Sequence, residues 1–144
     1  MPKVQADGLP LPQRYGAILT IVIGISMAVL DGAIANVALP TIATDLHATP
    51  ASSIWVVNAY QIAIVISLLS FSFLGDMFGY RRIYKCGLVV FLLSSLFCAL
   101  SDSLQMLTLA RVIQGFGGAA LMSVNTALIR LIYPVSYTHL TLPT

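Results

Sequence analysis

The sequence predicts an all-α membrane protein with four transmembrane helices. Of its 144 residues, 58% are hydrophobic and only 8% are charged, whereas about a quarter of the residues in a soluble domain are charged. The chain also contains four apolar segments that are each long enough to cross a hydrocarbon core of about 30 Å. Because backbone groups in lipid must be hydrogen-bonded within their own segment, each segment is expected to be a helix.

The first two expected helices cover residues 15–40 and 52–74. Pro40 and Pro50 are expected to bound the loop between them, because proline disrupts the interior of a helix. Thr49 suits the N-cap of the second helix, with Pro50 at the first helical position.

The last two expected helices cover residues 83–100 and 104–132. Gly75 and Gly79 indicate a loop before the third helix, because glycine permits tight turns. The polar stretch 101–103 offers N-caps for the fourth helix.

The basic residues indicate the orientation of the membrane domain, which covers residues 15–134 and follows an N-terminal tail over residues 1–14. The first and third loops contain no Lys or Arg, whereas the tail, the second loop region and the end of the fourth helix do. The positive-inside rule therefore places both termini in the cytoplasm. The bases expected there are Lys3, Arg14, Arg81, Arg82, Lys85 and Arg130.

The last residues, 135–144, differ from the rest of the chain. They contain no Asp, Glu, Lys or Arg, and their three threonines show no periodicity. They resemble the translation of sequencing-adaptor read-through, so we expect an artefactual tail that takes no part in the fold. Residues 1–134 are then expected to be the front of a longer protein.

Two charged residues lie inside the expected helices, Asp31 in the first and Arg111 in the fourth. Asp31 lies about 13 Å and Arg111 about 10 Å from the outer ends of their helices, at similar depth. Each charge costs about 2.5–3.5 kcal/mol at the centre of a membrane helix. We therefore predict that the two side chains approach each other and face a cavity. Intramembrane charges of this kind mark ion and substrate pathways, and Asp31 is a candidate for binding and releasing a proton.

Polar side chains in the same part of the membrane are candidates for lining a substrate cavity. Asn58 and Gln61 are spaced i, i+3 and share one face of the second helix. Hydrogen bonding between helices is an equally good explanation for such residues. The candidates are Asn36, Asn58, Gln61 and Gln114.

The stretch "GDMFGYRRIY", residues 75–84, is expected to be a compact basic loop. Asp76 can cap a helix or pair with Arg81 or Arg82, and Gly79 permits a tight turn. An ordinary positive-inside loop has the same charge, but the spacing of Asp, Gly and paired Arg suggests that this stretch is more than such a loop.

The sequence argues against a disulfide bond, against enzymatic activity and against nucleic-acid binding. Cys86 and Cys98 are about 18 Å apart along one helix and cannot form a disulfide with each other. The sequence offers no metal-binding cluster and no nucleophile–base pair, so neither an enzyme nor a cofactor is expected. The bases are too few and too scattered for nucleic-acid binding.

Four stretches carry a family resemblance. "LDGAIANVALP" (30–40) is similar to the pattern L-D-x-[ST]-I-V-N-V-A-L-P, and "SFLGDMFGYRR" (72–82) to G-x-L-A-D-R-x-G-R-[RK]-[RK], with Ser72, Met77 and Tyr80 departing from it. "LARVIQGFGGAAL" (109–121) matches a fourth-helix motif at Arg111, Gln114 and Gly115, and "WVVNAYQIA" (55–63) resembles a second-helix pattern. Together they resemble the major facilitator superfamily, and more closely its bacterial drug:proton antiporters with fourteen helices.

This resemblance implies that the four helices are the first part of the N-terminal six-helix half of a major facilitator fold. It implies proton-coupled export of small lipophilic or cationic compounds across the bacterial inner membrane, with alternating access between two halves. Arg111 would take part in proton movement. Asp76, Gly79, Arg81 and Arg82 would form a switch that latches one conformation. Without the remaining helices of the polypeptide, the four helices are not expected to transport.

Two rival classes remain open. A small four-helix multidrug exporter that works as a dimer would also place an acid in its first helix, but its loop charges would be nearly balanced. A four-helix membrane scaffold protein would have no need for Asp31 and Arg111 at matched depth. Substrate-driven proton flux through the reconstituted protein would distinguish a transporter from a scaffold.

Overall fold

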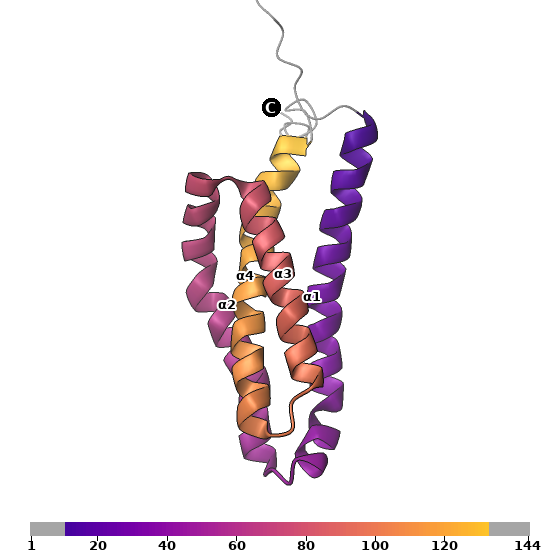
Figure 1. The fold of residues 1–144 in the computed structure, drawn as a ribbon, viewed down its shortest axis with the longest axis vertical. Helices are drawn as coiled ribbons and strands as arrows, with labels where there is room; N and C mark the ends of the chain where they lie inside the picture. Colours follow the sequence, from indigo (N-terminus) through magenta and orange to yellow (C-terminus); the bar gives the residue numbers. More distant parts are fainter. Residues whose placement is uncertain (1–10, 133–144) are drawn as a thin grey trace, which may run out of the picture.

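The computed structural model describes residues 11–132, and the expected tails over 1–10 and 133–144 lie outside the described residues. It contains four long helices: α1 (Leu11–Asp45), α2 (Pro50–Phe78), α3 (Tyr80–Ala99) and α4 (Leu104–Ile132). The helices run alongside one another in a bundle (Figure 1). The expected all-α architecture with four membrane-spanning helices is therefore confirmed.

The helix α4 lies at the centre of the bundle, packed along its length against both α2 and α3 (Figure 1). The helix α1 makes far fewer contacts with α2 and α4. Side chains of all four helices meet in one hydrophobic core. Its fully enclosed aromatic and aliphatic members include Phe91 of α3 and Val124 of α4.

Glycines in α4 allow its backbone to approach both neighbours closely. A Cβ at Gly117 would lie 2.7 Å from the backbone nitrogen of Phe91 in α3. A Cβ at Gly115 would lie 2.7 Å from the Cβ of Ala63 in α2. Both distances are too short for a side chain, so α4 can hold this central position only with glycine at these sites.

The expected end of the first helix at Pro40 is wrong. Pro40 lies inside α1, which continues to Asp45, so only residues 46–49 separate it from α2. Proline removes one helical hydrogen bond, but membrane helices tolerate this because the apolar surroundings favour every remaining backbone hydrogen bond. The helix α1 also begins at Leu11, within the stretch that was expected to be tail.

The expected start of α2 is confirmed. Thr49 is its N-cap and accepts a hydrogen bond from the backbone N–H of Ser52, and Pro50 occupies the first turn. At the start of α4, the hydroxyl of Ser103 likewise accepts a hydrogen bond from the backbone N–H of Met106. These caps satisfy backbone donors that the first helical turn leaves unpaired.

The expected loop over residues 75–84 is almost entirely helical. The helix α2 continues through Gly75 to Phe78 and α3 begins at Tyr80, which leaves Gly79 alone between them. Gly79 has a φ of +92°, a backbone conformation that glycine adopts without steric cost. The sequence therefore located the turn correctly but overestimated its length.

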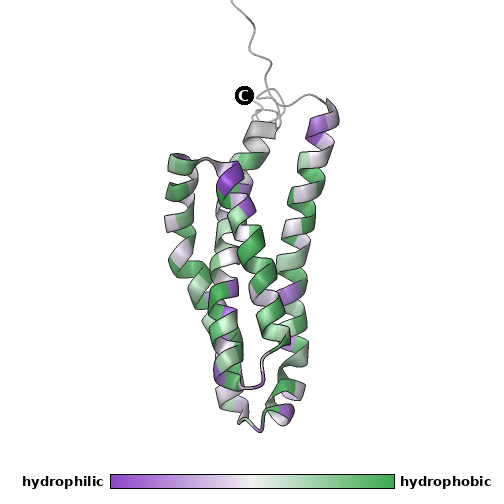
Figure 2. Ribbon diagram, in the orientation of Figure 1, coloured by the Kyte–Doolittle hydropathy of each residue, from purple (hydrophilic) through white to green (hydrophobic). Residues whose placement is uncertain are grey.

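All four helices are long and apolar enough to cross a membrane. Hydrophobic residues cover the outside of the bundle as well as its interior (Figure 2). The start of α1, the junction of α2 with α3, and the end of α4 lie at one end of the bundle (Figure 1). Arg14, Arg81 and Arg82 lie in the first turns of helices at this end.

Candidate functional site

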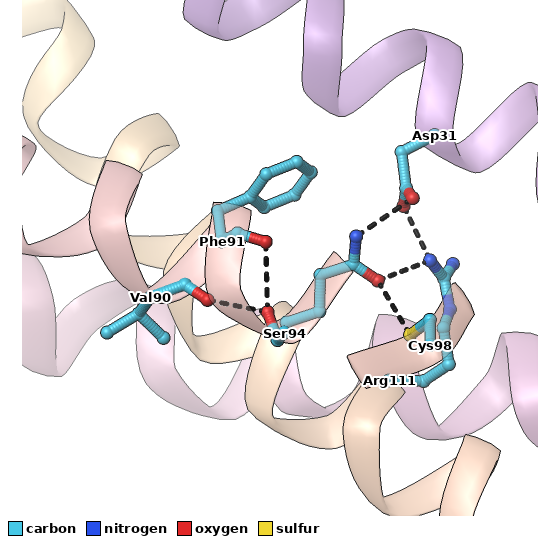
Figure 3. Close-up of polar contacts among 7 residues, drawn as sticks. Asp31, Val90, Phe91, Ser94, Cys98 and Arg111 are labelled. Carbon is cyan, nitrogen blue, oxygen red and sulfur yellow. Dashed lines mark hydrogen bonds and ion pairs between the residues drawn. The ribbon is translucent and has the colours of Figure 1, made fainter. Parts of the chain in front are cut away.

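A cluster of polar side chains joins α1 to α4 within the bundle (Figure 3). Arg111 Nη1 donates to Asp31 Oδ2 at 2.5 Å and to Gln114 Oε1 at 2.6 Å. Gln114 Nε2 donates to Asp31 Oδ1 at 2.9 Å. The carboxylate, the guanidinium and the amide therefore form a closed ring of hydrogen bonds. The predicted approach of Asp31 and Arg111 is confirmed.

The two charges differ in their access to the surface. The side chain of Arg111 is 4% exposed, whereas that of Asp31 is 20% exposed. Removing charges from water is costly unless they are paired and hydrogen-bonded. Within the four described helices, the carboxylate is therefore the more exposed member of the pair, and the guanidinium lies behind it.

Gln114 binds both members of the ion pair and has no exposed surface. It lies three residues after Arg111, so both side chains project from the same face of α4. As a cavity candidate it was expected to contact substrate. The structure instead places it inside the cluster, where it fixes the carboxylate and the guanidinium relative to each other.

Two members of the site were not among the predicted site residues. The thiol of Cys98 in α3 donates to Gln114 Oε1 at 3.6 Å. The ring of Tyr60 in α2 lies under the guanidinium of Arg111, with 4.2 Å between Arg111 Cζ and the ring centroid. Depth would have identified Tyr60, because it lies about 15 Å into α2 from Pro50, level with the charged pair.

The guanidinium uses only one of its nitrogens for these hydrogen bonds. Within residues 11–132, Arg111 Nε and Nη2 are buried and have no hydrogen-bond partner, and neither has the hydroxyl of Tyr60. A buried charged group is normally hydrogen-bonded throughout. The Tyr60 ring therefore supplies part of the stabilisation of this cation, through its negatively polarised face.

The other cavity candidates do not join this cluster. Asn36 of α1 and both Asn58 and Gln61 of α2 are exposed on the surface of the bundle. A groove of about 470 Å³ does lie between α2 and α4, but Ser52, Trp55 and α4 residues between Leu104 and Val112 line it. The structure does not place the four candidates around one cavity.

The switch residues gather at the junction of α2 with α3. Asp76 accepts a hydrogen bond from the hydroxyl of Tyr80, rather than pairing with Arg81 or Arg82 as expected. The reason is geometric: Tyr80 begins α3 directly after Gly79, so its ring folds back over the last turn of α2. Arg81 and Arg82 are exposed beside it.

Within the described part of the chain, no group of His, Cys, Asp or Glu side chains is arranged to hold a metal ion. Cys86 and Cys98 are both free thiols. The chemistry of the site therefore rests on one carboxylate, one guanidinium and the neutral groups around them. These features describe a polytopic α-helical membrane protein with a buried ion pair.

Comparison with known proteins defines the family. Residues 21–140 match the Major Facilitator Superfamily, and the chain belongs to this family of membrane transporters. This is a family of transporters and not of enzymes, in agreement with the class that the sequence predicted.

The curated relatives include transporters of different compounds. The Riboflavin transporter RibZ of Clostridioides difficile is 33% identical over 126 residues, which cover 88% of this chain and 28% of the relative. The Tetracenomycin C resistance and export protein of Streptomyces glaucescens is 35% identical over 127 residues, covering 88% and 23%. The Putative multidrug resistance protein MdtD of Salmonella paratyphi B is 38% identical over 128 residues, covering 85% and 27%. The chain thus spans about a quarter of the length of these relatives.

Proposed function

We propose that the full-length protein containing these helices exports small lipophilic or cationic compounds in exchange for protons, by alternating access. The buried ion pair of Asp31 and Arg111 is the observation that carries this proposal. Two of the relatives above bear names of export or multidrug resistance proteins, which supports export.

The proposed mechanism follows from the unequal burial of the pair. When Asp31 gains a proton, it loses its charge and most of its attraction for Arg111. The contact between α1 and α4 then weakens, and α1 is free to shift against the rest of the bundle. When the carboxylate loses the proton on the other side, the contact forms again. Proton binding is thereby linked to a movement of helices, which is what exchange transport requires.

We further propose that both ends of the described segment face the cytoplasm of a bacterial cell, with the helices in its inner membrane. The supporting observation is that Arg14, Arg81 and Arg82 belong to the same end of the bundle (Figure 1). Bases near helix ends favour the cytoplasmic side. A protease or thiol reagent applied from one side of the membrane tests this orientation.

The junction of α2 with α3 is the proposed conformational switch. Its exposed Asp76, Arg81 and Arg82 can form contacts with the later part of the same polypeptide, while Gly79 fixes the turn that presents them. The exposed Asn36, Asn58 and Gln61 are proposed to contact substrate or the helices that complete the cavity.

The experiment that tests the proposal uses everted membrane vesicles containing the full-length protein. An imposed proton gradient should drive accumulation of a lipophilic cationic dye. We expect Asp31→Asn to reduce this accumulation by at least about tenfold, because intramembrane charges of this kind are rarely dispensable. The matched control is Asp45→Asn, which removes an exposed carboxylate at the end of the same helix.

Other outcomes identify the rival functions. Full gradient-driven accumulation by Asp31→Asn would overturn the role of Asp31. Absence of substrate-driven proton flux in the reconstituted wild type would favour a membrane scaffold. Residues 1–134 alone are expected to show no proton-dependent efflux, and activity of this segment as a dimer would favour a small four-helix exporter.

A further inference from the structure

Tyr60 is held beside the ion pair by a close backbone contact between α2 and α4. A Cβ at Gly115 would lie 2.7 Å from the carbonyl oxygen of Tyr60, so the two backbones nearly touch at this level. Arg111 lies one helical turn before Gly115 and projects over the ring of Tyr60. Both side chains are 4% exposed. The position of this ring is therefore set by backbone packing.

The ring of Tyr60, rather than its hydroxyl, makes the contact with Arg111. The hydroxyl is buried and has no hydrogen-bond partner within residues 11–132. The guanidinium lies over the ring at 4.2 Å from its centroid, within the range of a cation–π interaction. An aromatic face attracts a cation without itself gaining or losing a proton.

Two groups of different kinds therefore stabilise the charge of Arg111, in addition to its hydrogen bond to Gln114. Asp31 is a carboxylate on α1 that can be neutralised by a proton, whereas the Tyr60 ring on α2 stays the same in either state. The Tyr60 ring therefore remains beside Arg111 when a proton neutralises Asp31. Since α2 and α4 are packed backbone to backbone, the ring and the guanidinium also stay together if α1 moves.

We propose that Tyr60 is a positioning residue for proton coupling, whose ring holds the Arg111 guanidinium in place while Asp31 is protonated and neutral. This inference rests on the proposed exchange of substrate for protons. Without the ring, a protonated Asp31 would leave the guanidinium held by one hydrogen bond, from Arg111 Nη1 to Gln114 Oε1. A single bond does not fix the orientation of the guanidinium, so it would turn about that bond, and deprotonation would no longer restore the contact that links α1 to α4.

The test separates coupled transport from transport down a gradient, with the full-length protein in everted vesicles. Tyr60→Leu should reduce proton-driven accumulation of the dye by about tenfold, since a desolvated cation–π contact has roughly that effect on an equilibrium. Equilibration of the same dye down its own gradient should stay within about twofold of wild type in this variant. Tyr60→Phe should retain both activities, because the hydroxyl that it removes has no partner. Tyr15→Leu is the control, since Tyr15 is exposed at the start of α1.

Three results would overturn the inference. They are coupled accumulation by Tyr60→Leu at the wild-type level, equal loss of coupled and downhill transport in folded protein, and failure of Tyr60→Phe to restore coupling. If Tyr60→Leu does not fold, Tyr60→Met provides a flexible side chain without a ring and the same criteria apply. A wild type without proton-driven accumulation would refute the proposed function, whereas a coupled wild type with a coupled Tyr60→Leu variant refutes only the role of Tyr60.

Discussion

The helices α4 and α1 both contribute a charge to the site, but they are held in the bundle in different ways. In the most apolar part of each helix, 61% of the α4 residues are buried within the bundle, whereas only 17% of the α1 residues are. Glycines bring α4 into backbone contact with α2 and α3, whereas Gly16 and Gly32 of α1 face open space.

The attachment of α1 depends on a small number of points. The polar cluster at Asp31 is one, and a hydrogen bond from the Tyr84 hydroxyl to the carbonyl oxygen of Thr20, 2.9 Å long, is another. Ile21 and Ala28 are buried between these points. A helix held by few contacts can move when one of them changes, whereas α4 cannot move without separating backbones. Among the four described helices, the ion pair thus joins the helix with the fewest contacts to the helix with the most.

The largest expected effect comes from breaking the contact between α4 and α3. Gly117→Leu places a side chain against the backbone of Phe91, which cannot yield as a flexible side chain would. We expect a loss of about 3 kcal/mol or more in the free energy of unfolding. Unfolding of the full-length protein in detergent measures it, with Gly16→Leu in α1 as the matched control. An equal loss in both variants would contradict the difference between the helices.

The next effect concerns the two ends of the ion pair. Asp31→Ala leaves a buried guanidinium without its counter-charge and should cost about 3–5 kcal/mol in the free energy of unfolding. Arg111→Ala should cost less, because the more exposed carboxylate of Asp31 can be hydrated or protonated. The double variant should be more stable than Asp31→Ala. Denaturant titration of the three proteins checks this order, and the reverse order would show that the charge on α1 is the more deeply buried one.

A smaller effect is expected at the second attachment point of α1. Tyr84→Phe removes the hydrogen bond to Thr20 and should cost about 1 kcal/mol. Amide hydrogen exchange should also become faster in α1 but not in α4. Tyr15→Phe removes an exposed hydroxyl from α1 and serves as the control. Faster exchange in α4 as well would mean that Tyr84 supports the whole bundle.

The smallest effect is expected at Gly32, where an added Cβ meets no atom within 4 Å. Gly32→Ala should raise the free energy of unfolding by about 0.5–1 kcal/mol, because alanine has the higher helix propensity. Thermal unfolding of the full-length protein measures this change. A loss of stability would sharpen the comparison by showing that later parts of the polypeptide pack against α1 at this position.

Depth along each helix could be predicted from the sequence, because every residue adds the same rise to a helix. That regularity predicted the contact of Asp31 with Arg111, although α1 continues to Asp45, so that Asp31 lies about 21 Å from its outer end and not about 13 Å. Composition predicted the membrane and four helices, and local chemistry predicted the cap at Thr49 and the turn at Gly79. For Asp76 the sequence suggested a helix cap or a pair with Arg81 or Arg82, but the short turn brought the Tyr80 hydroxyl to it instead.

Only the tertiary structure decided which side chains from other helices surround a residue at a given depth in the bundle. Gln114 enters the ion pair from α4. Tyr60 lies under Arg111 because Gly115 lets α4 approach α2 closely. The helix α1 likewise continues through Pro40. Local sequence rules treat proline as a helix end, but a membrane helix tolerates it when its surroundings satisfy the freed backbone group. The sequence by itself determined the fold class and the pairing of the two charges. The rotation and spacing of the helices, which depend on packing between distant segments, determined the rest of the site.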